Sequence, residues 1–154
     1  SAWTEIAEVS NARPEGGAGA GTSTAAFIIG GSYPGGNRYA LVEEWDGSSW
    51  TETGDINTAR AYMSSAGSVT DSIIGGGNAT APVGYFKALT EGWNGTTWTE
   101  VSDMATGRYG GNTGTGTGGT NLLVAGGETS PTSRPAATEE WSASDFQIKS
   151  VTTS

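Results

Sequence analysis

The chain repeats one pattern three times, at a period of about 48 residues. The tripeptide Trp-Thr-Glu begins at Trp3, Trp50 and Trp98, and a second tryptophan recurs at Trp45, Trp93 and Trp141. Self-similarity at a fixed period of roughly 20 to 50 residues is typical of repeat proteins, in which each period is one supersecondary unit. Any fold of this sequence must therefore set three equivalent units side by side.

Each period is predicted to form four short strands. A stretch of small residues comes first, at 17–21, 64–68 and 111–116, and an apolar run follows that ends in Gly30-Gly31, Gly75-Gly76 and Gly126-Gly127. The third strand is expected at 39–45, 86–93 and 135–141, and the fourth begins at Trp50, Trp98 and Phe146. Asp-Gly and Asn-Gly pairs accept positive φ with little strain, so those at 46–47 and 94–95 predict tight hairpins before the fourth strand.

A four-stranded unit of roughly 40 to 50 residues is typical of a β-propeller blade. Blades crowd near the propeller axis, which leaves room only for Gly, Ala and Ser on the innermost strand. The second strand is apolar at consecutive positions, as a strand covered on both faces must be. The predicted fold class is therefore an all-β propeller with three four-stranded blades, at 12–53, 59–101 and 107–151, preceded by an outer-strand segment at 1–8.

A further residue type recurs once per period. Arginine follows each Trp-Thr-Glu tryptophan by ten residues, at Arg13, Arg60 and Arg108. With the small strand, the Gly-Gly pair, the strand ending in an aromatic residue and the Trp after the turn, this pattern resembles the kelch family over nearly the entire chain. The chain departs from the usual pattern in two ways, because Trp45, Trp93 and Trp141 stand where Tyr is common and Phe146 replaces the last Trp.

The amino-acid sequence of the repeat carries a second, narrower resemblance. The segments WDGSSWTE and WNGTTWTE, together with INTAR, look like kelch-type repeats in virion-associated proteins of tailed bacteriophages, especially marine ones. That resemblance implies a virion-associated or extracellular location. It also implies a displayed structural or binding role.

Three blades are too few to close a ring, because propellers typically have about four to eight. The chain is expected either to pair with a second copy in a six-bladed homodimer or to be part of a larger polypeptide. Four outer strands also compete for three places, at 3–6, 50–53, 98–101 and 146–151. We expect the leading strand of each copy to complete the third blade of the other, which leaves no exposed sheet edge. In the alternative, the tail keeps its place and residues 1–8 reach across the interface.

Composition removes several classes of function. Sixteen acidic against seven basic residues give a formal charge of −9, which repels nucleic acid and anionic membranes, and no apolar run is long enough for membrane insertion. The chain has no cysteine and no histidine, so it lacks the usual general base, the usual nucleophile pairs and the best transition-metal ligands. We expect no metal site, no cofactor and no enzymatic activity. A carboxylate mechanism is the one catalytic alternative that remains.

The repeated charged residues have a structural and a functional interpretation. Arg13, Arg60 and Arg108 are expected to pair with the equally periodic Glu43, Glu91 and Glu139, and the alternative is a ring of cations at one mouth of the channel. Glu5, Glu52 and Glu100 are expected to be solvated rather than to form a glycosidase pair. The tryptophans are expected in the core rather than as sugar-stacking platforms.

The segments that break the period are the best candidates for recognition. The loops at 32–38, 77–85 and 128–134 differ in length and chemistry, and variable loops on a rigid scaffold are where binding residues gather. Strand order places them on one face with the connector at 54–58. The candidate ligand-binding residues are Tyr33, Asn37, Arg38, Asp55, Asn57, Asn78, Tyr85 and Arg134. The alternative is that these loops are merely solvated.

Together these features predict a non-catalytic binding or structural module. It would be a homodimeric kelch-like propeller, displayed on a virion or outside a cell, that recognises a glycan or a surface protein through its variable loops. The alternatives are a carboxylate-dependent carbohydrate-active enzyme and an intracellular protein-interaction adaptor.

Overall fold

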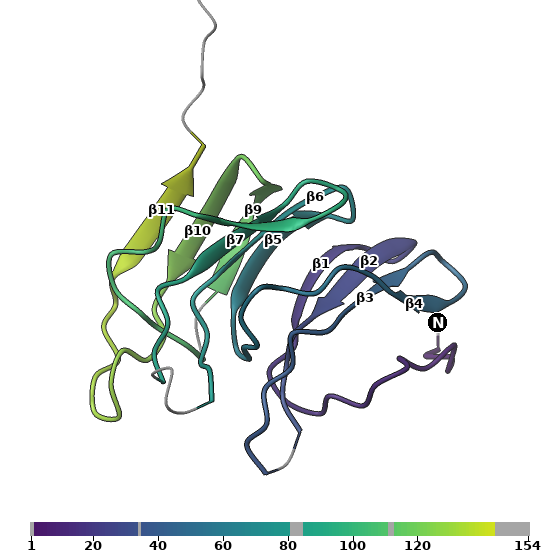
Figure 1. Cartoon of the computed structure of the whole chain (residues 1–154), viewed down its shortest axis with the longest axis horizontal. Helices are drawn as coiled ribbons and strands as arrows, with labels where there is room; N and C mark the ends of the chain where they lie inside the picture. Colours follow the sequence, from purple (N-terminus) through teal and green to yellow (C-terminus); the bar gives the residue numbers. More distant parts are fainter. Residues whose placement is uncertain (1, 34, 81–84, 111–112, 144–154) are drawn as a thin grey trace, which may run out of the picture.

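A computed structural model describes residues 2–33, 35–80, 85–110 and 113–143, which form three antiparallel sheets in a row (Figure 1). The first sheet contains β1 (Ala18–Thr22), β2 (Ala25–Ile29), β3 (Val42–Trp45) and β4 (Trp50–Glu52). The second contains β5 (Ser64–Ser68), β6 (Asp71–Gly75), β7 (Thr90–Trp93) and β8 (Trp98–Val101). The third contains β9 (Thr113–Gly118), β10 (Asn121–Ala125) and β11 (Thr138–Ser142). We call these sheets blade 1, blade 2 and blade 3.

Each strand pairs with the next along the chain, as the repeat predicts. The hairpin turns are also as expected. A carboxylate oxygen of Asp46 accepts the backbone N–H groups of Ser48 and Ser49 at 2.8 Å, and the amide oxygen of Asn94 accepts the equivalent bonds in blade 2 at 2.9 and 3.0 Å. Within the described residues there is no helix that could cross a bilayer.

The two candidate closing segments differ in what the structure describes. The strand expected to begin at Phe146 lies outside the described residues. Residues 2–8 form no strand in the single chain, and the Trp3 side chain is fully exposed. Its repeat counterparts Trp50 and Trp98 instead lie on β4 and β8, as predicted.

The innermost strands are as crowded as the small residues predict. β1, β5 and β9 lie side by side, and the Ser65 hydroxyl donates to the Gly19 carbonyl of the neighbouring blade at 2.6 Å. A Cβ added at Gly67 would lie 2.6 Å from the Cα of Gly118, closer than side-chain atoms approach. Small residues are therefore required where β5 meets β9.

One expected glycine pair is shifted by a residue. The equivalent pairs are Gly30-Gly31, Gly76-Gly77 and Gly126-Gly127, because all six have positive φ and the first N–H of each pair bonds a carbonyl before the third strand. Gly75 thus takes the place of Ile29 in blade 1, opposite Thr90 instead of Val42. A Cβ at Gly75 would lie 3.2 Å from Leu122, so this glycine allows blade 3 to approach closely.

The core is divided between the two interfaces of the row. Between blades 1 and 2, Phe27, Ile29 and Val42 pack against Ile74, Trp93 and Trp98. Between blades 2 and 3, Ile73 packs with Leu122 and Val124, and half-buried Met104 and Trp141 extend the cluster.

The tryptophans divide into three groups by exposure. Trp45, Trp93 and Trp98 are buried, so the core prediction is confirmed for these three. Trp50 and Trp141 are half-buried, and Trp3 is exposed. The position of a tryptophan in the row of blades therefore matters as much as its position in the repeat.

Candidate functional site

The periodic arginines form structural ion pairs, as the repeat indicates. Arg60 pairs with Glu91 at 2.6 Å, and both side chains are fully buried. The same guanidinium donates to the carbonyls of Gly76 and Leu89 at 2.7 and 2.8 Å. Arg13 with Glu43 and Arg108 with Glu139 repeat this arrangement in their own blades. We call these three contacts the Arg–Glu pairs, and their burial removes the cations from any channel mouth.

The second oxygen of each glutamate binds the connector that leads into the blade. The backbone N–H groups of Ser10, Asn57 and Ala105 donate to Glu43, Glu91 and Glu139 at 2.7, 2.7 and 2.6 Å. Burial acts to raise the pKa of the Glu43 carboxyl, but hydrogen bonds from Ser10 and Asn11 and the charge of Arg13 outweigh it and lower the pKa. The Glu43 carboxylate is therefore held ionised, and all three glutamates serve as structural groups.

Two of the candidate ligand residues lie in the connector between blades 1 and 2. The Asn57 side-chain amide donates to Glu91 at 2.9 Å and to the Trp98 carbonyl at 3.2 Å. Asp55 is exposed nearby. The structure thus places the Asn57 side chain in the support of an Arg–Glu pair.

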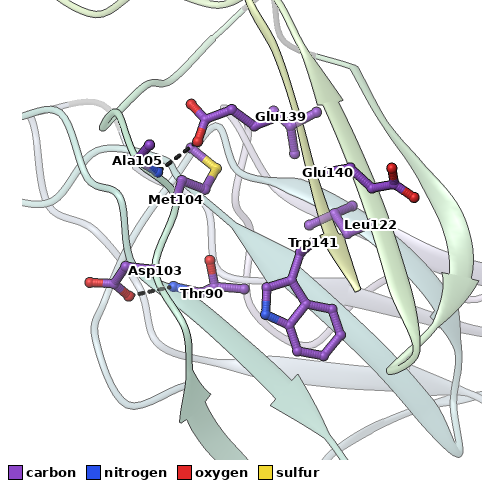
Figure 2. A pocket seen from close by; sticks show the side chains of 9 residues that line it. Thr90, Asp103, Met104, Ala105, Leu122, Glu139, Glu140 and Trp141 are labelled. Atoms are coloured by element: carbon purple, nitrogen blue, oxygen red, sulfur yellow. Dashed lines mark hydrogen bonds between the residues drawn. The ribbon is translucent and has the colours of Figure 1, made fainter. Parts of the chain in front are cut away.

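A cleft of about 240 Å³ opens between blades 2 and 3, and Figure 2 shows Asp103, Glu139 and Trp141 around it. These residue types could serve carbohydrate chemistry, but both Glu139 oxygens are occupied by Arg108 and the Ala105 N–H. Asp103 accepts the Thr90 N–H at 3.3 Å. The cleft is therefore a loosely packed part of an interface whose polar groups serve the fold. Glu52 and Glu100 are exposed on their outer strands, as expected.

The three variable loops lie on one side of the row, at the lower edge of Figure 1. We call this side the loop face. Arg38 donates to Asn78 at 2.6 Å, linking the first loop to the second, while Asn78 itself is fully buried. Arg134 pairs with Glu128 at 3.1 Å within the third loop. Asn37 and Tyr33 are exposed at the first loop, so the predicted residues divide between loop contacts and free surface.

Tyr85 belongs to an aromatic cluster that the sequence did not reveal. Its ring centroid lies 5.0 Å from Tyr109 and 5.3 Å from Phe86, and Tyr109 lies 5.9 Å from Tyr62. We call Tyr62, Tyr85, Phe86 and Tyr109 the tyrosine cluster. Tyr85, Phe86 and Tyr109 line a hollow of about 380 Å³ together with Glu128 and Pro131. Tyr62 and Tyr109 were missed, although both follow a periodic arginine within two residues and neither recurs in blade 1.

The phenols of Tyr62 and Tyr109 stay protonated at neutral pH. The hydrogen bond with Tyr85 and burial raise the pKa of Tyr109. Burial, and the hydrogen bond that its hydroxyl donates to Glu15 at 3.1 Å, raise the pKa of Tyr62. Both groups therefore present neutral hydroxyls at the loop face. Among the described residues no group of His, Cys, Asp and Glu is arranged to hold a metal ion.

Three blade-like sheets with this connectivity define a chain that resembles part of a kelch propeller. The structure of YjhT, a kelch-repeat propeller protein, matches with a TM-score of 0.72 at 18% sequence identity. The match covers 85% of this chain and 43% of that chain, so the present chain spans less than half of YjhT. No family model and no curated protein matches the sequence. At this identity the likeness shows the fold alone.

Proposed function

We propose that the chain is a non-catalytic binding or structural module, displayed on a virion or outside a cell, that recognises a glycan or protein through its loop face. One contrast carries the proposal. The repeated arginines and their partner glutamates are consumed in the Arg–Glu pairs, whereas Tyr33 and Tyr85, which break the repeat, lie exposed on the loop face. A scaffold built from repeated residues with variable loops at one edge is an arrangement suited to recognition.

We further propose that a second copy completes the ring to six blades. Blade 3 supports this, because Leu123 on β10 is 39% exposed while its neighbours Leu122 and Val124 are buried. That face of the blade lacks a covering layer among the described residues. The coverage of 43% of YjhT also fits a half-ring.

The aromatic pairs of the outer strands indicate how the copies would join. Trp50 packs on Trp45 and Trp98 packs on Trp93, each with ring centroids 5.4 Å apart. Trp3 is exposed and Trp141 is half-buried. Trp3 of one copy on Trp141 of the other would repeat the same pair, with residues 3–6 added beside β11.

The oligomeric state tests the ring. Sedimentation velocity should give twice the 15.6 kDa chain mass, and Trp3→Ala should shift the protein toward single chains. Tyr33→Ala is the matched control, because Tyr33 is also an exposed aromatic residue but lies on the loop face. A stable species of one chain mass at micromolar concentration would contradict the two-copy ring. A dimer that Trp3→Ala leaves unchanged would assign the closing strand to the tail instead.

Glycan and protein arrays test recognition. Excess unlabelled chain should reduce the array signal of the labelled chain. The signal should also fall when Tyr85 is replaced by Ala. Hydrolysis of a polysaccharide that a single Glu substitution abolishes would instead establish the carboxylate enzyme. Absence of any ligand on both arrays would refute recognition through the loop face.

A further inference from the structure

We propose that Tyr62, Tyr85 and Tyr109 form a binding site for an uncharged saccharide, where the loop face meets the innermost strands. The inference rests on the proposed function, because it assigns a ligand class and named residues to recognition through the loop face. It departs from the sequence-based candidates by adding Tyr62 and Tyr109 and by setting Tyr33 aside.

The backbone of Tyr62 adopts an unusual conformation. Its φ of 59° makes it the only non-glycine residue of the described chain with positive φ. The same position is Gly16 in blade 1, with φ of 66°, and Gly110 in blade 3, with φ of 57°. A bulky side chain is disfavoured in this region, and such outliers gather at functional sites. Blade 2 thus holds a tyrosine at a position where blades 1 and 3 have the glycine that this backbone conformation favours.

Gly16 of the neighbouring blade 1 leaves space for the Tyr62 ring. A Cβ added at Gly16 would lie 2.8 Å from Tyr62 ring atoms, so any side chain there would displace the ring. The Tyr62 N–H also donates to the Gly16 carbonyl at 2.6 Å, and the Gly110 N–H donates to the Tyr62 carbonyl at 3.4 Å. Backbone contacts from both neighbours therefore fix Tyr62 at the centre of the row.

The rings of Tyr62, Tyr109 and Tyr85 contact one another edge to face. Tyr62 meets Tyr109 at an interplanar angle of 63°, and Tyr109 meets Tyr85 at 87°. Such edge-to-face contacts hold the rings in place. Tyr85 is 51% exposed and lines the hollow of about 380 Å³. A preformed aromatic surface with hydroxyls at its edge fits the apolar C–H face and the rim of hydroxyls of a sugar ring.

The charged groups beside the cluster are paired or hydrogen-bonded. Glu15 accepts hydrogen bonds from Tyr62 and Ser32 at 3.1 and 3.2 Å, and Glu128 pairs with Arg134 at 3.1 Å. Arg38 binds Asn78 at 2.6 Å. Among these four groups the two carboxylates and the two guanidinium groups balance in charge. Sugar hydroxyls both donate and accept, and can therefore bind carboxylates and guanidinium groups alike. These groups favour an uncharged saccharide.

The test uses the full chain and a panel of oligosaccharides. Maltohexaose, cellohexaose and mannohexaose are titrated by calorimetry, with hexagalacturonate and a hexalysine peptide as charged comparators. We expect at least one uncharged hexasaccharide to bind more tightly than both comparators. Tyr62→Gly and Tyr85→Ala should each weaken that binding about tenfold, the size of one lost stacking contact. Thr51→Ala, the control, replaces an exposed residue of the outer strand β4 and should change it less than about twofold.

Tyr62→Gly is informative because glycine is the residue of the other two blades, so the variant should fold. Its circular dichroism and urea midpoint verify this. Saccharide binding that survives both Tyr62→Gly and Tyr85→Ala would overturn the site. Tighter binding of hexagalacturonate or hexalysine, or no binding of any uncharged hexasaccharide, would overturn the ligand class. In either case a protein or charged glycan found on the arrays would leave recognition through the loop face standing.

Discussion

Blades 2 and 3 have nearly the same repeat but different surroundings. In β6 of the middle blade, Ser72 to Gly75 are all buried, whereas in β10 of blade 3 the burial alternates and Leu123 is exposed. Trp93 is buried and its counterpart Trp141 is only half-buried. The motif thus sets strand order and ion pairing, while the burial of Leu123 depends on a further blade against that face of β10.

The Arg–Glu pairs show the same gradient. Arg60 and Glu91 are fully buried, and the Arg60 Nε donates to the Thr58 carbonyl at 3.3 Å. Glu139 is 22% exposed, and the buried Nε of Arg108 has no partner within the described ranges. The charges of blade 2 are therefore more completely desolvated and more completely satisfied than those of blade 3.

The largest expected effect breaks the buried pair of blade 2. Arg60→Leu should destabilise the protein by about 3–5 kcal/mol, because it leaves the Glu91 carboxylate buried without its cation. Arg108→Leu should cost less, about 1–3 kcal/mol, because water reaches Glu139. Urea unfolding at pH 7 measures both. Equal losses would contradict the different environments of the two blades.

The tryptophans give the next largest contrast. Trp93→Ala should cost about 3–5 kcal/mol, because the ring is buried against Phe27 and Trp98 and its Nε1 donates to the Val69 carbonyl at 2.9 Å. Trp141→Ala should cost about 1–3 kcal/mol, because the ring lines an open cleft. The same urea experiment compares them. A larger loss from Trp141 would show that its interface is covered more fully than the chain alone provides.

The two glycines beside Tyr62 sharpen the comparison at the inner strands. Gly110→Ala should cost about 1 kcal/mol, since the described chain leaves the space for its Cβ free and only the positive φ opposes it. Gly16→Ala should cost more, because its Cβ would meet the Tyr62 ring at 2.8 Å. Thermal unfolding of the two variants provides the measurement. Adding Tyr62→Gly to Gly16→Ala should remove the difference.

The smallest expected effect compares the hairpin turns of blades 1 and 2. Hydrogen bonds from Ser49 and Ser48 lower the pKa of the exposed Asp46 to about 2. Because the folded pKa is depressed, this contribution is present above the ordinary pKa of Asp and is lost as the pH falls toward 2. Asp46→Asn should bring the turn close to that of Asn94. The urea midpoints of the two proteins should therefore converge between about pH 4 and pH 2. A constant difference over that range would contradict the assignment.

The parts of the fold that were predictable are those fixed by period alone. Arg60 and Glu91 recur in step, so their pairing followed from the repeat, and the crowding at Gly67 followed from its small neighbours. The run Gly75-Gly76-Gly77 could not be aligned from its letters, because only φ and the partner carbonyl distinguish its members. Trp141 was expected in the core, but its burial depends on what covers blade 3.

The tyrosine cluster was beyond sequence reasoning for a geometric reason. Glu15, Tyr62 and Tyr109 are 47 residues apart in each step, and only the stacking of blades brings them together. Tyr62 also follows the periodic Arg60 by two residues, so the sequence offered no reason to separate it from the repeat. Its conformation, read against Gly16 and Gly110, is what distinguishes it.

Each Arg–Glu pair is assembled from residues of one period, from Ser10 to Glu43, Asn57 to Glu91 and Ala105 to Glu139. A gene duplication or deletion of a whole period therefore adds or removes a cation together with its own anion. A deletion that removes Glu91 but keeps Arg60, and that is not a whole period long, would instead leave a charge unpaired in the interior. The number of blades in such a chain can therefore change by whole periods without leaving an unpaired charge in the interior.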